Sequence, residues 1–527
     1  MLLAPEIPRK PAKPKLYAVY RDFRGGWNAD AAPDSLALNE LALADNVDLD
    51  ERGAASKRKG TAPLNAVSYG AQVERIIEWS KNDGTKIKMA VVGSDLCRIA
   101  DDGTKTVVKA LSAPDIGWFV FQDKFWFAGK EAGTDKFWTY DGATVAEVTP
   151  NSATDNDLTP VKRCRIFEWH PKSFRVFATG DPNDRAALYY SQPNDPTYFK
   201  NTSKLYPTTQ DGPAHGLGMF GNALMPLYRN SAWAWKGSDP ATDAVWERLP
   251  VGQGTVAPRT IRLTPNSLTF LGQGGLYSLS PGLLDYNVIL VAGDELVKNQ
   301  AKDKVTSVIR SIVHPETACA LFDPYNERYL LAYGDDPANP RNNKILVLDW
   351  GLKAFTRYTG LQVNDFCLTA NGDILAATNG YILKMGQAYR DWDPVTGSYK
   401  PIEMALKSRQ HDLSLADASL VFHVKQLFRV FLAARQYGSE TSSADITVTC
   451  DSKSVSFPGV SLDQSLTWGE PWGNTWGWED FTTREARCRL KGKRVQTLFE
   501  NRNIDEPVTL YGYAFEYQVL RARGVKV

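Results

Sequence analysis

The chain has 527 residues, of which 43% are hydrophobic and 11% aromatic, and its 61 Lys and Arg nearly balance its 60 Asp and Glu. This hydrophobic content suffices for a sizeable core and excludes a largely disordered chain, while the balanced charge argues against a protein whose main task is to coat nucleic acid. No apolar run approaches the ~20 residues that a membrane-spanning helix needs, and the length predicts more than one domain.

Residues 1–65 are expected to form an extended N-terminal arm. Prolines alternate with Lys and Arg at its start, a pattern typical of extended chain rather than of a packed element. A turn-rich passage follows, and then a short helix over 35–43 and a strand over 46–49 are predicted. The basic run at 57–59 either contacts DNA phosphates or an acidic neighbour, or belongs to a solvated tether.

Residues 66–398 are expected to form a β-propeller of six or seven blades. Runs rich in Val, Ile, Phe, Tyr and Trp are separated by Gly, Asn, Asp and Pro, as in short strands joined by turns. Comparable strand starts recur near Ile87, Ile116, Cys164, Ala214, Ser267, Thr317 and Gln362. Most steps are close to the ~40–50 residues of a four-stranded blade. A pair of β-sandwiches is the alternative, but its strands would be less regularly spaced.

Residues 399–527 are expected to form a C-terminal β-sandwich, so that the fold class is all-β. Alternating aromatic residues at 511, 513, 515 and 517 predict one of its strands. The run over 420–435 also has apolar residues every three or four positions, as a helix would. Its dense Val and Phe favour a strand.

No catalytic, metal or cofactor site is predicted. The six cysteines form no C-x-x-C pair, and the five histidines have no H-E-x-x-H spacing. Residues 216–221 match G-x-G-x-x-G but lead into further strand, so turn glycines are favoured over a dinucleotide site. Acidic pairs at 101–102 and 335–336 lie in turn-like contexts. The chain is therefore expected to be neither an enzyme nor dependent on a cofactor.

The most unusual local feature is a cluster of four tryptophans within eleven residues, Trp468, Trp472, Trp476 and Trp478. Exposed aromatic platforms stack on sugars or anchor a protein partner. The alternative is that these side chains pack the end of the sandwich. As a functional site, protein–protein contact is favoured over sugar binding.

One N-terminal pattern is more specific. A Gly-Gly-aromatic-Asn turn is followed by Pro-Asp, L-x-x-N-E, N-V-D, Gly and R-x-G-x-x-x-L. The residues that carry it are Gly25, Gly26, Trp27, Asn28, Pro33, Asp34, Leu36, Asn39, Glu40, Asn46, Val47, Asp48, Gly53, Arg58, Gly60 and Leu64. The pattern resembles the opening of the β-propeller tail nozzle, or tail-hub, proteins of tailed bacteriophages, also called packaged-DNA stabilisation proteins. Segments at 188–199 and 511–517 agree with the resemblance, whereas Trp27 stands where Leu is commoner.

The resemblance implies a virion structural protein of the tail, made in the host cytoplasm. Such a nozzle is expected to form a ring, here a hexamer closed by head-to-tail contacts, that continues the DNA channel, retains the packaged genome and releases it. The implied partners are further copies of the chain, neighbouring tail or adaptor proteins, viral DNA passing without sequence recognition, and a host surface.

The candidate interface residues are the turn Gly25, Gly26, Trp27 and Asn28 and the four clustered tryptophans. A receptor- or glycan-binding propeller at a phage tail tip is the alternative function. A propeller hydrolase, which needs carboxylates and arginines at the central funnel, is a third.

Overall fold

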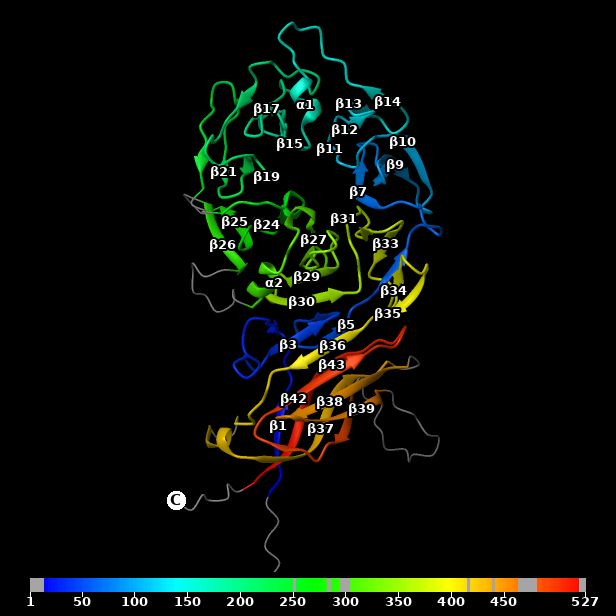
Figure 1. Cartoon of the computed structure of the whole chain (residues 1–527), viewed down its shortest axis with the longest axis vertical. Helices are drawn as coiled ribbons and strands as arrows, with labels where there is room; N and C mark the ends of the chain where they lie inside the picture. Colours follow the sequence, from blue (N-terminus) through cyan, green and yellow to red (C-terminus); the bar gives the residue numbers. More distant parts are fainter. Residues whose placement is uncertain are drawn as a thin grey trace, which may run out of the picture. The chain divides into compact units, whose positions relative to one another are not determined.

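The chain is all-β, as its pattern of strand-like runs and turns predicts. The computed structural model describes residues 14–249, 253–281, 286–293, 304–414, 418–437, 441–462 and 481–520 (Figure 1). Two compact units divide the chain: Lys59–Ile402, here called the propeller unit, and Met1–Arg58 together with Glu403–Val527, here called the two-sheet unit. In the described parts of the chain, no helix has the length and apolar character needed to cross a membrane.

The propeller unit is built from antiparallel sheets that follow one another around a common centre (Figure 1). Five separate four-stranded sheets within the described residues are complete blades. They consist of β7 (Val73–Ser80), β8 (Lys86–Val92), β9 (Asp95–Ile99) and β10 (Lys105–Lys109); β11 (Gly117–Phe121), β12 (Lys124–Glu131), β13 (Thr134–Tyr140) and β14 (Val145–Glu147); β15 (Ile166–His170), β16 (Arg175–Thr179), β17 (Leu188–Tyr190) and β18 (Lys204–Leu205); β23 (Arg262–Thr264), β24 (Ser267–Leu271), β25 (Gly275–Pro281) and β26 (Tyr286–Gly293); and β31 (Asp365–Leu368), β32 (Ile374–Ala377) and β33 (Ile382–Met385) with β6 (Thr61–Pro63).

Five separate four-stranded sheets in the described residues are fewer than the six or seven blades predicted, because two strand groups depart from that pattern. β19 (Gly216–Phe220) pairs with β20 (Ala223–Leu227), and β21 (Trp233–Ala234) with β22 (Glu247–Arg248), but only isolated bridges connect the two pairs. β27 (Cys319–Asp323), β28 (Arg328–Tyr333), β29 (Lys344–Asp349) and β30 (Ala354–Thr359) pair in order without forming a separate four-stranded sheet. A hairpin of β34 (Arg390–Asp393) and β35 (Ser398–Pro401) follows β33.

The last blade takes its fourth strand from the beginning of the unit. β6 pairs antiparallel with β33, with Pro63 opposite Leu383 and Thr61 opposite Met385. The first strands of successive groups contact one another in series, from β11 to β15, β19, β23, β27 and β31, and β31 contacts β7. The predicted boundaries at 66 and 398 are therefore too narrow, because residues 61–63 complete the last blade and β35 continues to Pro401 within a unit that ends at Ile402.

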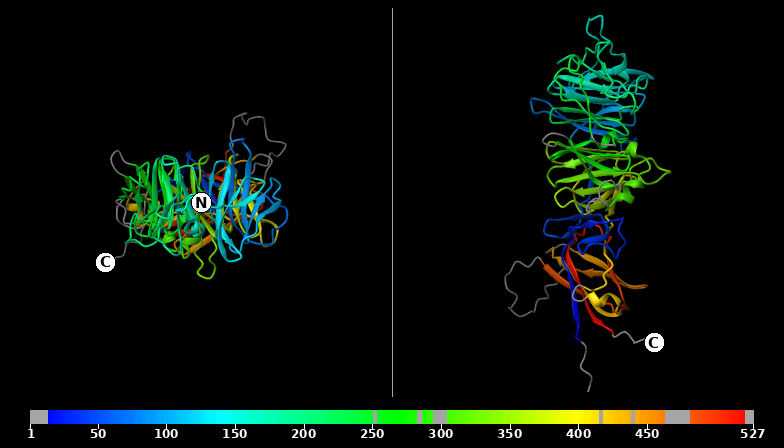
Figure 2. Two further views of the ribbon diagram at one scale, coloured as in Figure 1. Left: turned by 90° about the horizontal axis from the view of Figure 1, so that it is seen from above. Right: turned by 90° about the vertical axis from the view of Figure 1, so that its left-hand side faces the viewer.

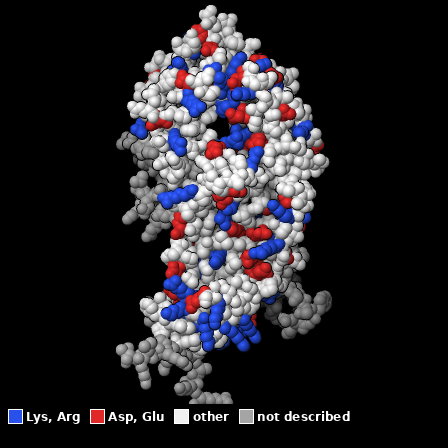
Figure 3. Space-filling view, viewed as in Figure 1, with Lys and Arg blue, Asp and Glu red and all other residues white. Residues whose placement is uncertain are grey.

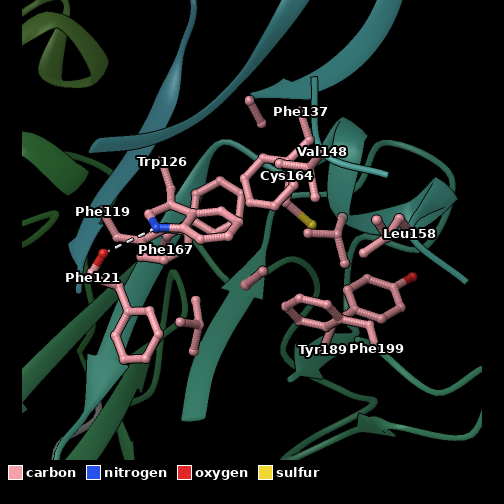
Figure 4. Packing of buried hydrophobic residues seen from close by; sticks show 14 of the residues in the cluster. Phe119, Phe121, Trp126, Phe137, Val148, Leu158, Cys164, Phe167, Tyr189 and Phe199 are labelled. Atoms are coloured by element: carbon pink, nitrogen blue, oxygen red, sulfur yellow. Dashed lines mark hydrogen bonds between the residues drawn. The ribbon is translucent and has the colours of Figure 1, made fainter. Parts of the chain in front are cut away.

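Aromatic side chains fill the space between neighbouring blades. Figure 4 shows one such cluster, in which Phe119 and Trp126 of one blade meet Phe167 of the next. The rings of Phe137 and Phe167 stack with their centroids 6.1 Å apart, and the Trp126 indole N–H donates to the Phe121 carbonyl at 3.2 Å. Such close aromatic packing explains why the strand runs of this unit are rich in Phe, Tyr and Trp.

The glycine pattern at 216–221 lies in the β19–β20 hairpin, with no helix after it. A Cβ atom at Gly216 would lie 2.4 Å from Ile261 Cδ1, and one at Gly218 would lie 2.6 Å from Leu268 Cδ2. These glycines therefore let β19 approach the neighbouring blade, and they form no nucleotide loop.

The two-sheet unit mixes strands from both ends of the chain (Figure 2). One sheet has the order β4 (Val47–Leu49), β5 (Ala55–Lys57), β43 (Thr509–Val519), β37 (Lys425–Arg435) and β40 (Phe481–Arg487), with β1 (Leu16–Tyr20) on β43 and β41 (Lys491–Gly492) on β37. The other joins β2 (Gly26–Trp27), β3 (Glu40–Asp45), β36 (Met404–Ser408), β42 (Val495–Asn501), β38 (Ser443–Cys450) and β39 (Lys453–Ser461). Phe499 of the second sheet meets Tyr513 of the first at 5.5 Å between ring centroids.

This arrangement corrects the prediction of a separate arm over 1–65 and a sandwich over 399–527. From residue 14 to 58 the chain supplies five strands, and strands of the C-terminal block pair with three of them, β1, β3 and β5. The helix predicted over 35–43 is also wrong, because β3 occupies Glu40–Asp45 and so short a helix is marginal without packing. The strand predicted over 46–49 is confirmed by β4, and the one predicted over 420–435 is confirmed from residue 425 on by β37, with the 3-10 turn η3 (Ala418–Phe422) before it.

Candidate functional site

The predicted interface turn at 25–28 is a tightly hydrogen-bonded corner. Gly25 N–H donates to the Asn39 carbonyl and Asn28 N–H to the Leu41 carbonyl, at 3.1 and 3.0 Å. A Cβ atom at Gly25 would lie 2.6 Å from the Asn39 carbonyl oxygen, and Gly26 has a φ of +66°. Both glycines are therefore required by the close approach of the turn to β3.

The polar members of the pattern hold the loop between β2 and β3. The Asn28 side-chain amide donates to Glu40 Oε2 at 3.1 Å, and the same carboxylate oxygen accepts the Ala37 N–H at 3.0 Å. Asn28 Oδ1 in turn accepts the N–H groups of Asp30 and Ala31. Asn28 and Glu40 thus hydrogen-bond to each other and together fix the backbone of the loop between β2 and β3.

The four turn residues lie together, but most of them are buried within the two-sheet unit. Trp27 is only 4% exposed, Gly25 and Gly26 are buried, and Asn28 is half-buried. This burial favours a structural role over the interface role expected for them. The other interface candidates, Trp468, Trp472, Trp476 and Trp478, lie outside the described residues.

The basic run at 57–59 is largely internal, so neither of its two predicted roles holds for its first two residues. Lys57 is 2% exposed, and its ammonium donates to Asn501 Oδ1 at 2.6 Å and to the Asn503 carbonyl at 2.8 Å. Arg58 is 1% exposed and donates through Nε to Asn46 Oδ1 at 2.8 Å. These cations satisfy buried acceptors and are not available to DNA phosphates.

A second basic segment, which sequence reasoning missed, is exposed. From the last residue of β40 to just past β41, exposed residues alternate with buried ones, and the buried ones are Cys488, Leu490 and Gly492. The exposed cations, here called the basic strip, are Arg487, Arg489, Lys491, Lys493 and Arg494. Arg487 pairs with Glu485 at 3.4 Å and Arg494 with Asp34 at 2.7 Å, whereas the structure as described gives the three cations between them no ion pair. The signal that could have found it is the period-2 spacing of charge in a strand.

Charged side chains of both signs also gather where the inner strands of the propeller unit begin. Arg75 on β7 pairs with Asp365 on β31, Nε to Oδ2, at 3.0 Å. Glu74 is held by Arg341 through a two-pronged pair, with Oε2 2.9 Å from Nη1 and Oε1 3.1 Å from Nη2. Asp365 is 3% exposed, and its Oδ1 has no partner among the described residues. Figure 3 shows an opening in this unit with Lys, Arg, Asp and Glu around it.

One carboxyl group of an inner strand titrates far from its ordinary range. Burial raises the pKa of Glu168, on β15, to about 7. The six cysteines are buried and unpaired, and the described residues contain no group of three or more His, Cys, Asp or Glu that could hold a metal ion.

No protein-family model and no curated protein matches this chain. Among solved structures it is similar to virginiamycin B lyase from Staphylococcus aureus, at 14% identity over 60% of this chain and 95% of that one, with a TM-score of 0.39. It is also similar to the WD40 β-propeller domain of Doa1, at 9% identity over 63% of this chain and 96% of that one, with a TM-score of 0.35. A third match is an extracellular domain assigned to a hybrid two-component system of B. thetaiotaomicron. The identity is 9% over 86% of this chain and 62% of that one, and the TM-score is 0.43. These distant likenesses carry no argument about function.

Proposed function

We propose that this chain is a structural subunit of a bacteriophage tail, which assembles into a ring that continues the DNA channel as a nozzle or hub. The observation that supports the proposal is that residues of the N-terminal pattern make structural contacts. Gly25, the Asn28–Glu40 pair and the Asn46–Arg58 pair each make a specific contact within the two-sheet unit. The pattern that resembles the tail-nozzle family is therefore an architectural one, as expected of a structural subunit.

The same pattern continues into the propeller unit. Gly60 N–H donates to the Ala388 carbonyl and Leu64 N–H to the Ile382 carbonyl, both at 2.8 Å. A Cβ atom at Gly60 would lie 1.8 Å from the Arg390 carbonyl oxygen. The pattern thus spans the last residues of one unit and the strand that completes the last blade of the other, so one motif would serve both units of a nozzle subunit.

Ring assembly has a candidate surface in β39, which is the edge strand of its sheet within the part of the chain that the structure describes. Most of its residues are exposed, in alternation with half-buried ones. The edge strand of a sheet can pair with a strand of another chain, so a second copy in head-to-tail contact would dock along β39. A hexameric ring is the expected product.

The basic strip is the candidate contact for DNA. Phosphate contacts carry no sequence information, and they suit a channel that DNA of any sequence must cross. A narrow strip on a chain of nearly balanced charge would touch the passing DNA without holding it tightly. The alternative of a glycan-binding tail tip depends on tryptophans outside the described residues, and nothing in the described part favours it.

Electron microscopy and mass measurement of the full chain, alone and with tail partners, test the assembly. We expect sixfold rings, and we expect Ser454→Lys on β39 to reduce them because lysine on a strand edge opposes pairing. Thr106→Lys, at an exposed position on β10, is the matched control and should leave the rings intact. A chain that stays monomeric under all these conditions would overturn the nozzle assignment.

A further inference from the structure

A cavity of about 180 Å³ opens in the propeller unit near the starts of its inner strands. Glu74 comes from β7 and Asn364 from the residue before β31, while Arg259 lies in the 3-10 turn η1 (Pro258–Thr260) before β23. Arg341 and Asn342 precede β29. Glu316 and Thr317 come from the 3-10 turn η2 (Pro315–Thr317), so five separate segments of the chain converge on one small space.

Arg259 differs from the other arginines around this space. Arg341 is paired with Glu74 and Arg75 with Asp365, whereas the Arg259 guanidinium has neither an ion pair nor a hydrogen bond among the residues that the structure describes. Burial lowers the pKa of Arg259 and the positive charge of Arg75 lowers it further, which the Asp365 carboxylate partly offsets. Arg259 is half-buried, and a guanidinium stays charged in proteins, so its free donors favour the binding of an anion.

The rest of the lining does not neutralise Arg259. The Glu74 carboxylate is already engaged by Arg341, and the Glu316 side chain is 63% exposed and faces His314 at 3.3 Å. The Asn342 amide donates to the Thr317 and Val363 carbonyls, each at 2.9 Å, and the Asn364 amide donates to the Val73 carbonyl at the same distance. The amide donors are therefore in use, and the guanidinium is the uncompensated group of the cavity.

We propose that this cavity binds a small oxyanion, a carboxylate or a phosphate, through the Arg259 guanidinium. The planar fork of arginine donors matches the paired oxygens of either group. At ~30 Å³ per water molecule, the cavity holds the equivalent of about six waters, which suits a ligand of a few heavy atoms and excludes a nucleotide. The proposal is independent of the ring assembly and of the DNA contact.

Calorimetric titration of the full chain with inorganic phosphate and, separately, with acetate and malonate at constant ionic strength tests the site. We expect one saturable site per chain for at least one of these anions and a matching rise in the thermal midpoint. The anion that binds more tightly distinguishes phosphate from carboxylate recognition. Absence of saturable binding for all three would overturn the proposal.

Two substitutions separate the site from general charge effects. Arg259→Met should weaken binding at least tenfold, and Arg259→Lys should weaken it less, because the charge remains while the fork is removed. Arg98→Gln, on β9 in a different surface groove, is the matched control and should bind as the original chain does.

Without ligand, Arg259→Met should have the same thermal midpoint as the original chain, because the Arg259 side chain makes no ion pair or hydrogen bond among the described residues that the substitution would remove. Equal weakening in Arg259→Met and Arg98→Gln, or unfolding of both Arg259 variants, would contradict the assignment.

Discussion

Glu168 lies on β15, an inner strand of the propeller unit, and burial raises the pKa of its carboxyl group from 4.5 to about 7. The folded state therefore keeps a proton that the unfolded state loses between about pH 4.5 and pH 7. The free energy of unfolding should fall as the pH rises through this window, by up to ~3 kcal/mol, and then level off.

Glu168→Gln should remove this pH dependence, because the amide stays neutral. The variant should match the original chain near pH 4.5 and be more stable at pH 8, as measured by urea unfolding across the pH range. Glu51→Gln, at an exposed position, is the control and should follow the original chain throughout. If Glu168→Gln is the less stable protein at pH 8, the carboxylate has a partner that stabilises its charged form.

At the scale of strands, the basic strip, which runs from the end of β40 past β41, should be the main DNA contact. Changing Arg489, Lys491 and Lys493 together to Glu replaces three cations that form no ion pairs within the described chain. DNA affinity should fall for every sequence tested, and the slope of log affinity against log salt should become shallower by ~0.9 for each phosphate that the variant no longer neutralises. Binding titrations of duplex DNA at several salt concentrations measure both quantities.

The control for this triple change places the same charges on the propeller unit. Lys105, Lys124 and Lys130 are exposed there, and changing them to Glu alters the net charge equally. If both triple variants show the same fall in affinity, long-range charge rather than the basic strip explains the DNA binding.

Local elements could be predicted from the sequence wherever the deciding contacts are local. The β11–β12 hairpin is one such case, because Gln122 and Asp123 both adopt positive φ in the two-residue turn that right-twisted strands favour. The prediction of a separate arm is wrong because the partners of this segment are remote: Lys15 pairs with Glu516, 501 positions away. Strand pairing over such a distance leaves no periodic trace in the segment itself.

The candidate sites follow the same logic. Charge at Lys57 is visible in the sequence, but the Asn501 side chain that accepts its hydrogen bond is 444 positions away. Glu74 and Arg341 are 267 positions apart, and only the ring of inner strands brings them near Arg259. The basic strip, in contrast, could have been predicted, because its charged residues alternate with other residues within one short segment, from Arg487 to Lys493.

At the scale of the whole molecule, the chain runs from the two-sheet unit into the propeller unit and back, and the propeller unit contains both strands of the β6–β33 pair. A fragment of residues 59–402 should therefore fold alone, whereas one of residues 66–402 should be less stable. The shorter fragment lacks the β6–β33 pairing and the Asn65 side chain, which accepts the Ile382 N–H at 2.9 Å and donates to the Gly380 carbonyl at 3.0 Å. At ~1 kcal/mol for each buried hydrogen bond, the thermal midpoint should fall by at least about 5 °C. Circular dichroism of the two fragments measures the difference, and equal midpoints would show that the last blade is stable without its fourth strand.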